Sequence, residues 1–329
     1  MTCAPCAADM GVLNRVVDRV RVLARHRSLA VTGAELTLLG HGRAALDIGR
    51  LSEELQVHKR IVRRYGAPFH VPLPEPSQAV NKTVWVCWLQ GMEGAPELVQ
   101  RCFESVRDHF AGWNIVVLTS EDFSEYAQLP AFIVEKWRRG AFGAAHFTDL
   151  LRVDLLTRLG GLWLDATVLC TGTLSDAFLE KNDLFLFQIL PPNALGRSIR
   201  ASSWLIWAKA SNPILAETRR LLWRYWEKED ALFDYFLLHH FIALAMERHP
   251  EEARRILPAS TTPPHTLQFR LFEPYDEDVW AMLVRQSDFH KLTYRIDPSD
   301  AEKPGTFYAR LIGKELAQYP QNNVKNGKS

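Results

Sequence analysis

Beyond residue 80, short apolar runs alternate with segments whose apolar positions follow a helical period. Residues 83–89 and 114–118 are rich in β-branched and aromatic side chains, which is typical of buried strands. Residues 96–109 lie between these two runs and have the apolar spacing of a helix. A second helix is predicted over 148–159, followed by Gly160, Gly161 and a short apolar strand that ends at Asp165. This alternation predicts an α/β domain.

The first 80 residues have a different pattern and predict two helices. In the first helix, apolar residues recur at helical spacing and arginines occupy much of the remaining surface; the apolar set is Val12, Leu13, Val16, Val17, Val20 and Leu23. The second helix is expected to begin at Ser52 and to end at Gly66. Its last turns carry four basic residues, Lys59, Arg60, Arg63 and Arg64.

A proline-rich segment separates these helices from the α/β part. Prolines stand at positions 68, 72, 74 and 76, and this density excludes a helix and predicts an extended connector. We therefore expect two regions. Residues 1–80 form a helical, basic extension with its connector, and residues 81–329 form a single larger domain.

Composition narrows the class of protein. The chain has 329 residues, of which 47% are hydrophobic and 11% aromatic, enough to bury a sizeable core and to exclude a disordered chain. The net charge of +1 argues against a protein that binds nucleic acid through its overall field. The five cysteines are an odd number at scattered positions, which fits a reducing cytoplasm better than a disulfide framework.

The charge is nevertheless unevenly distributed. Residues 1–80 contain eleven Lys or Arg and seven Asp or Glu, a net +4, whereas the remainder carries −3. Two interpretations stay open: the basic residues form an ordinary solvated face, or they are attracted to an anionic membrane surface. The first residues do not have the pattern of a secretory leader, and no apolar run reaches about 18 residues, so neither a leader nor a membrane-spanning helix is expected. We expect a cytoplasmic protein, either soluble or peripheral at the inner face of the membrane.

Candidate chemistry concentrates around the strand that ends at Asp165. In α/β sheets, ligands bind at the carboxyl ends of strands, so this carboxylate points to a binding crevice. Asp149 and Arg152 are three residues apart and share one face of the predicted helix. Spacing alone favours an ordinary surface ion pair for these two residues.

The motifs resemble those of a known family. The stretch from Thr148 to Arg152, then Gly160-Gly161 and Asp165-Ala166-Thr167, resembles the capsular polysaccharide synthesis proteins, which are relatives of the family 32 glycosyltransferases. Residues 84–91 are similar to the family's opening strand, Ala95-Pro96 to its first helix start, and 290–294 to its closing motif. The resemblance covers roughly residues 81–295. It implies a GT-A-like domain, with a Rossmann-like mixed sheet flanked by helices.

The resemblance also implies an activity. Such a protein would transfer a sugar, with retention of configuration, from a nucleotide-sugar donor, expected to be a UDP-sugar, to a surface polysaccharide or a lipid-linked glycan precursor. A catalytically weakened sugar-nucleotide-binding module and a peripheral membrane scaffold of a glycan-assembly complex are the alternatives. Nucleic acid is not an expected partner.

The same resemblance assigns roles to residues at the donor site. Asp165 would bind a metal ion or the diphosphate, Lys291 would bind phosphate, and His290 would be a further metal ligand. Asp149 and Arg152 would hydrogen-bond the donor sugar, although a surface ion pair is their alternative. Trp88 would stack on the base, with Trp85 as the second choice and core packing as the alternative for both.

The chain departs from the family's pattern at the expected metal site. Relatives hold Mn²⁺ or Mg²⁺ with two aspartates separated by one residue, whereas here Thr167 takes the place of the second acid. The expected metal site therefore consists of Asp165 and His290, with a hydroxyl in place of a carboxylate.

Three further features receive weaker interpretations. Asp234 and His239 resemble the acceptor side of the family site, with His239 as the candidate proton acceptor, although an ordinary core histidine is the alternative. Ser202 and its neighbours are similar to a strand facing the acceptor, or are simply the start of a strand. Cys3 and Cys6 lack the second pair that a zinc site needs.

Overall fold

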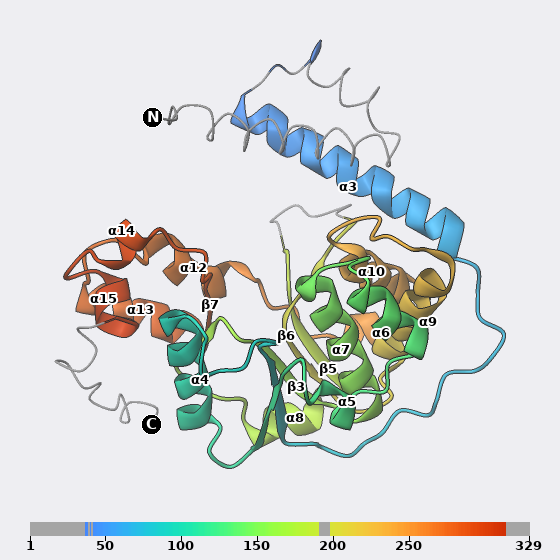
Figure 1. Cartoon of the computed structure of the whole chain (residues 1–329), viewed down its shortest axis with the longest axis horizontal. Helices are drawn as coiled ribbons and strands as arrows, with labels where there is room; N and C mark the ends of the chain where they lie inside the picture. The colour runs from blue at the N-terminus through green and yellow to red at the C-terminus, as the bar shows by residue number, and fades with distance from the viewer. Residues whose placement is uncertain (1–36, 39, 41, 191–197, 314–329) are drawn as a thin grey trace.

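The computed structural model describes residues 37, 38, 40, 42–190 and 198–313 (Figure 1). The predicted first helix and the Cys3–Cys6 pair lie outside the described residues. Within them the protein is an α/β structure in which a mixed sheet is flanked by helices, as the sequence predicts.

Five strands form the main sheet in the order β2-β1-β3-β6-β5. The strands are β1 (Thr83–Cys87), β2 (Asn114–Leu118), β3 (Gly161–Asp165), β5 (Leu184–Gln188) and β6 (Ala201–Ala208). β1 pairs in parallel with β2 and β3, whereas β6 runs antiparallel to both β3 and β5. The parallel strands β1 and β3 end side by side, and Cys87 is paired with Asp165.

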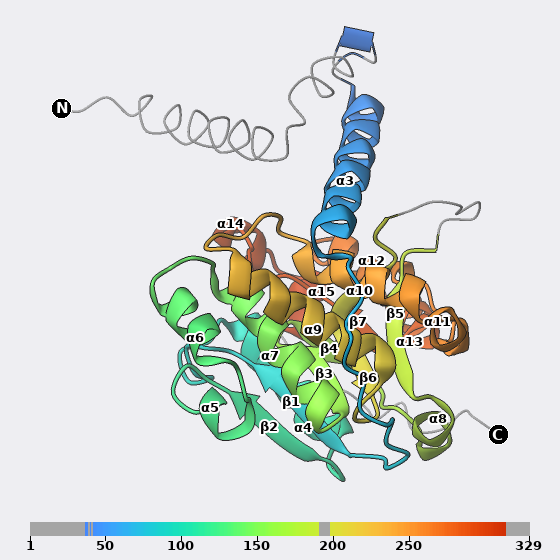
Figure 2. The same ribbon diagram turned by 90° about the vertical axis from the view of Figure 1, so that its right-hand side faces the viewer.

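Helices cover both faces of this sheet (Figures 1 and 2). Side chains alternate along each strand, so that Trp85 and Trp163 join one core cluster and Val84 and Leu162 join the other. The first cluster contains α5 (Phe123–Tyr126), α6 (Ala131–Arg138), α7 (Ala144–Arg158), α9 (Pro213–Lys228) and α10 (Leu237–Arg248). The second contains α4 (Glu97–His109) and α8 (Asp176–Lys181).

Helix α7 is buried on nearly all sides. Ten of its residues are buried, including Arg152 and Asp154, because the helix lies between the sheet and helices α6, α9 and α10. Its polar side chains therefore require partners within the protein. Asp154 accepts hydrogen bonds from Arg158 and Arg219, whereas Arg152 turns toward the carboxyl end of β3.

A two-stranded antiparallel sheet lies beside the main one. β4 (Val168–Cys170) follows directly after Asp165 and pairs with β7 (Phe289–Lys291) from the C-terminal part of the chain. A third apolar cluster packs around it, with side chains from α4 and the C-terminal helices. These helices are α12 (Thr262–Arg270), α13 (Glu277–Gln286), α14 (Pro298–Ala301) and α15 (Phe307–Leu311); α11 (Pro250–Arg255) follows α10.

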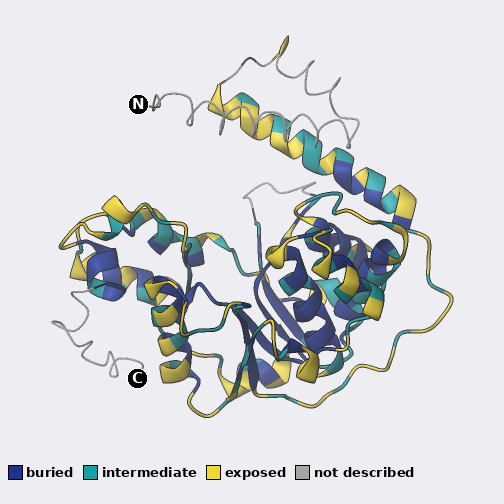
Figure 3. Cartoon of the chain, viewed as in Figure 1, coloured by how far each residue is buried: buried dark blue, intermediate teal, exposed yellow. Residues whose placement is uncertain are grey.

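Helix α3 (Arg43–Tyr65) precedes the sheet and projects from the rest of the protein (Figure 2). Only its second half is packed: Val57, Ile61 and Tyr65 are buried in the largest core cluster, whereas the first half is exposed (Figure 3). The Tyr65 hydroxyl donates to Glu229 at 2.6 Å, and His58 lies 3.4 Å from His240 of α10. No helix in the described part of the chain combines the length and apolar character that a bilayer crossing requires.

The predicted boundaries hold with one exception. The helices over 96–109 and 148–159 and the strand over 114–118 match α4, α7 and β2 to within a few residues. The connector after Gly66 contains neither helix nor strand until Thr83, as its prolines predict. The predicted start at Ser52 is wrong, because α3 begins at Arg43. Good helix formers precede Ser52, and its hydroxyl accepts a hydrogen bond from Gln56 inside the helix.

Candidate active site

The strand ends of β1 and β3 bring one carboxylate to the edge of the sheet. Two glycines with positive φ, Gly160 (71°) and Gly161 (106°), turn the chain from α7 into β3. A Cβ on Gly161 would lie 2.6 Å from the carbonyl oxygen of Thr83, so only glycine fits this close approach. Asp165 then ends the strand on the same face as Trp163, toward α7.

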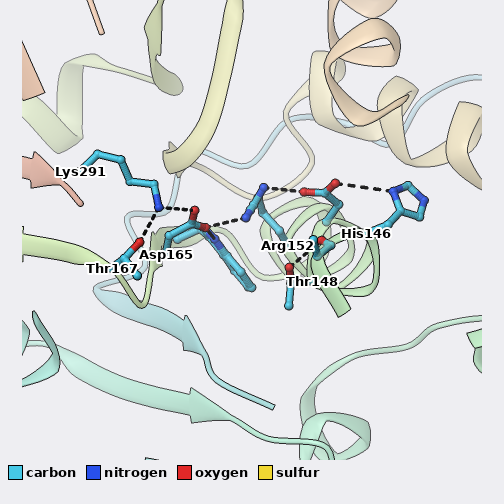
Figure 4. Close-up of polar contacts among 9 residues, drawn as sticks. His146, Thr148, Arg152, Asp165, Thr167 and Lys291 are labelled. Atoms are coloured by element: carbon cyan, nitrogen blue, oxygen red, sulfur yellow. Dashed lines mark hydrogen bonds and ion pairs between the residues drawn. The ribbon is translucent and has the colours of Figure 1, made fainter. Parts of the chain in front are cut away.

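Asp165 and three other side chains form a chain of alternating charge (Figure 4). Lys291 Nζ lies 3.2 Å from Asp165 Oδ2, and Arg152 Nη2 donates to Asp165 Oδ1 at 2.7 Å. Arg152 Nη1 donates to Asp149 Oδ1 at 2.8 Å. The lysine comes from β7, the arginine from α7 and the acid from β3, so residues more than a hundred positions apart meet at one point.

This environment keeps Asp165 ionised. Burial by itself would raise the pKa of the carboxyl, but the adjacent Lys291 and Arg152 outweigh it and lower the pKa below its ordinary value. Arg152 is almost fully buried, at 4% side-chain exposure, whereas Asp165 and Lys291 keep 27% and 20%. Arg152 therefore pairs with Asp165 from the buried side, and Asp165 and Lys291 stay accessible to a ligand.

Lys291 also contacts the residue that replaces the second acid. Its ammonium group donates to the Thr167 hydroxyl, and Thr167 itself is buried. The backbone supports this contact, because Leu292 N donates to the carbonyl oxygen of Thr167 at 2.9 Å. Asp165, Thr167 and Lys291 therefore lie together, and their roles at a donor site stay predictions.

His290 points elsewhere. It is paired with Leu169 and Lys291 with Val168, and consecutive strand residues face opposite sides of a sheet. His290 is fully buried beside Trp280 and Thr171, with ring centroids 5.5 Å apart in the first case and Nε2 3.3 Å from the hydroxyl in the second. Burial lowers its pKa to about 4. The structure does not bring this imidazole to Asp165.

Trp163 is a site residue that the sequence interpretation missed. Its indole Nε1 donates to Asp165 Oδ1 at 3.0 Å, and its ring lies under the Arg152 guanidinium at 4.8 Å. The sequence contained a signal for Trp163, because residues two apart on a strand share a face and Trp163 is two residues before Asp165. Trp163 thereby holds both partners of the Arg152–Asp165 ion pair in position.

His146 was missed in the same way. It lies three residues before Asp149 on α7, and its Nδ1 is 3.6 Å from Asp149 Oδ2. Trp226 of α9 donates to the other ring nitrogen at 3.0 Å, which fixes the orientation of the imidazole. Helical spacing places the two residues on one face, so the pattern alone contained this pair.

Trp88 follows directly after β1 and lies at the same edge of the sheet. It is partly buried, and its Nε1 is enclosed without a hydrogen-bond partner. Its ring meets Tyr294 edge to face at a centroid distance of 5.2 Å, and Tyr294 is 43% exposed. Trp85, the second choice, is 3% exposed and donates to the carbonyl oxygen of Gly160, so it belongs to the core.

The two acceptor-side candidates occupy different environments. His239 of α10 is close enough to the charge chain for Asp149 and Arg152 to act on it; burial is the main effect and lowers its pKa to about 4. Its Nδ1 is buried without a partner. Asp234 precedes α10, accepts from the Phe236 backbone N–H, and lies 3.6 Å from His240 instead. Ser202 is in β6 and donates to the carbonyl oxygen of Phe187.

The residues at this point do not fit a divalent metal ion. Across the described residues, no group of three His, Cys, Asp or Glu side chains is placed to hold one. Asp165 is the single acid of the expected pair, and each of its oxygens already faces a cation. His290, the other expected ligand, faces away from it.

No curated protein matches the chain. A solved structure titled "PaToxG Glycosyltransferase" is similar, with 13% sequence identity, a TM-score of 0.38, and coverage of 80% of this chain and 95% of its own.

A protein-family model matches much more of the chain than the motifs alone. The model described as "Capsular polysaccharide synthesis protein" matches residues 59–311, from the second half of α3 to the end of α15. The match includes Asp149, Asp165 and Lys291, and it confirms the resemblance that the motifs indicate. The chain therefore belongs to the capsular polysaccharide synthesis protein family.

Proposed function

We propose that the protein is a GT-A-type glycosyltransferase. It transfers a sugar from a nucleotide-sugar donor, of the UDP class, to a surface polysaccharide or a lipid-linked glycan precursor. One observation carries this proposal: the chain Lys291–Asp165–Arg152–Asp149, assembled at the carboxyl ends of parallel strands in a family of capsule synthesis proteins.

The chain of charges suits the leaving group of such a donor. The bond between the anomeric carbon and the diphosphate breaks, and negative charge accumulates on the departing oxygen. Lys291 is partly exposed, and in this proposal its ammonium group neutralises this charge. Asp165 and Thr167 hold the ammonium group in place, so little reorganisation is needed during the reaction.

The remaining residues have roles in recognition. Asp149, which Arg152 holds in place, offers its carboxylate to the hydroxyls of the donor sugar, and Trp88 offers an aromatic surface to the base. On the acceptor side, His239 is neutral at physiological pH, so its imidazole accepts a hydrogen bond from a non-reacting hydroxyl of the acceptor and orients it. Asp234, which precedes α10 and lies 3.6 Å from His240, belongs to the same proposed acceptor side.

We further propose that the anomeric configuration is retained. The acceptor oxygen bonds to the anomeric carbon on the face that the diphosphate leaves, and the hydroxyl proton passes to a departing diphosphate oxygen. This route needs no covalent intermediate with the enzyme.

Donor hydrolysis tests this proposal directly. The full-length protein is incubated with a panel of nucleotide sugars, and release of the nucleoside diphosphate is measured. We expect release from at least one donor, and a loss of at least about 100-fold in Asp165→Asn, because removal of a preorganised electrostatic contact typically costs this much. Binding of a nucleotide sugar without turnover across the panel, in the presence of candidate acceptors, would instead indicate a binding module.

A matched control is available at the opposite edge of the sheet. Asp183 forms an ion pair with Lys209 at 2.7 Å, where the amino end of β3 lies next to Ala208. Asp183→Asn removes a comparable contact remote from Asp165, and it should leave donor hydrolysis unchanged. Equal losses in both variants would contradict the proposed role of Asp165.

A further inference from the structure

The site presents a cation of its own where related enzymes use a metal ion. Lys291 Nζ lies 3.2 Å from Asp165 Oδ2 and donates to the Thr167 hydroxyl. Asp165 and Thr167 stand at the positions of the two metal-binding acids in related enzymes. The ammonium group therefore lies between them, in the place where the ion would bind.

The charge balance of the cluster also favours a lysine over a metal ion. Two carboxylates, Asp149 and Asp165, face two basic side chains, Arg152 and Lys291, so the formal charges of the cluster cancel without a further ion. A divalent cation on Asp165 Oδ2 would lie next to the ammonium group and be repelled by it. The other oxygen is already engaged by Arg152 and by the Trp163 indole.

Lys291 keeps the capacity to bind a phosphate. An ammonium group has three N–H donors, and the contacts with Asp165 and Thr167 use two of them. Its side chain is 20% exposed, and that of Asp165, which it contacts, is 27% exposed. One donor therefore remains for a diphosphate oxygen.

From these observations we propose that Lys291 replaces the divalent metal ion. It binds the diphosphate of the donor and neutralises its charge as the glycosidic bond breaks, and transfer needs neither Mn²⁺ nor Mg²⁺. Thr167 is the substitution that makes this possible, because a hydroxyl accepts a hydrogen bond from the lysine without adding a second negative charge. The inference rests on the proposed function.

Nucleotide binding tests this inference without requiring turnover. UDP and uridine are titrated into the full-length protein by calorimetry, with EDTA and then with Mn²⁺. We expect the UDP dissociation constant to agree within about twofold between the two conditions. Lys291→Met should weaken UDP binding at least tenfold and leave uridine binding unchanged, and Lys291→Arg should restore part of the loss, because its guanidinium also binds phosphate.

The control for these variants is Lys209→Met. It removes a buried lysine that pairs with an aspartate at the opposite edge of the sheet, and UDP binding should be unaffected. The converse variant is Thr167→Asp combined with Lys291→Met, which restores the pair of acids and removes the ammonium group between them. Electron paramagnetic resonance should detect Mn²⁺ bound to this variant more tightly than to the wild-type protein.

The outcomes separate the inference from the proposed function. Binding of UDP to the wild-type protein only when Mn²⁺ is present would overturn the inference and leave glycosyl transfer intact. An unchanged UDP affinity in Lys291→Met would overturn it as well. If no nucleoside diphosphate binds under either condition, the proposed function itself fails.

Discussion

Arg152 shows how a single side chain joins the two acids of the site. Its two terminal nitrogens donate to different carboxylates, Asp149 and Asp165, at 2.8 and 2.7 Å. The guanidinium is planar and presents its donors in a fixed fork, whereas a lysine has one nitrogen on a flexible chain. Arginine is therefore required by geometry as well as by charge.

Arg152→Lys is expected to abolish most activity in a folded protein. The ammonium group reaches one acid at a time, so Asp165 or Asp149 loses its partner, and donor hydrolysis should fall by about 100-fold. Arg158→Lys is the control on the same helix, because Arg158 pairs with Asp154 away from the site. Steady-state hydrolysis of both variants checks this, and an active Arg152→Lys enzyme would show that bridging is unnecessary.

Gly161 is the second residue on which the site depends. Its φ of 106° disfavours any other residue, and an added Cβ would also lie 2.6 Å from the Thr83 carbonyl oxygen and 2.9 Å from Trp85 Nε1. Gly161→Ala therefore combines backbone strain with a clash between β1 and β3.

A matched substitution separates these two effects. Gly140 has a φ of +77° but open space around its Cα, so Gly140→Ala should cost only about 1 kcal/mol of unfolding free energy. We expect Gly161→Ala to cost at least about 3 kcal/mol, because the clash adds to the strain. Chemical denaturation measures both values, and similar losses would mean that the sheet accommodates the methyl group.

At the scale of elements, β7 divides its two functional candidates between two faces. Adjacent positions in a sequence suggest a pair, but alternation along a strand sends Lys291 toward Asp165 and His290 into the apolar cluster around Trp280. A sequence motif alone does not show on which face of a strand each side chain lies. This follows only after the residues have been assigned to a strand.

Burial of His290 predicts a specific dependence of stability on pH. Its pKa is about 4 in the folded protein and about 6.5 in the unfolded chain, so the unfolded state takes up the proton first as the pH falls. Stability from the neutral imidazole is fully present above pH 6.5 and is lost between pH 6.5 and 4, by up to about 3 kcal/mol. His290→Leu should lack this part of the acid sensitivity.

The comparison is made by urea denaturation of both proteins between pH 7 and 4. Subtracting the two curves removes the contributions of other titrating groups. A difference that stays constant over this range would contradict the buried, neutral state of His290.

Helix α3 makes a second prediction at the element scale, because only its second half is packed. Ile61 is 1% exposed in the main core, and Ile61→Ala should lower the unfolding free energy by about 2 to 4 kcal/mol. Leu51 on the same helix is 44% exposed, and Leu51→Ala should change it by less than about 0.5 kcal/mol. Equal effects would contradict the observed docking of α3.

At the scale of the whole molecule, the periodicity of apolar residues was sufficient to predict the fold class and several of its elements. Apolar runs and helical spacing predict the α/β class, β2 and the proline connector, because each of these depends on local sequence. The start of α3 was missed because Ser52 has the properties of a helix cap while lying inside a longer helix. The order of strands and the pairing of β4 with β7 depend on contacts far apart in sequence, and periodicity does not contain them.

The residues of the candidate site also divide into those that local sequence identifies and those that only the fold brings together. Asp149, Arg152 and Asp165 were identified by motif, and the fold brings them together with Lys291 from a strand 126 residues beyond Asp165. Trp163 and His146 share a face with residues already identified, so closer use of the strand and helix periods would have found them. The absence of His290 from this cluster follows from the register of β7, which only the fold determines.

A structure of the full-length protein with bound UDP tests the central claim most directly. We predict the diphosphate at the carboxyl ends of β1 and β3, with an oxygen within hydrogen-bonding distance of Lys291 Nζ and the uracil ring near Trp88. A diphosphate bound away from Lys291 and Asp165 would contradict the account.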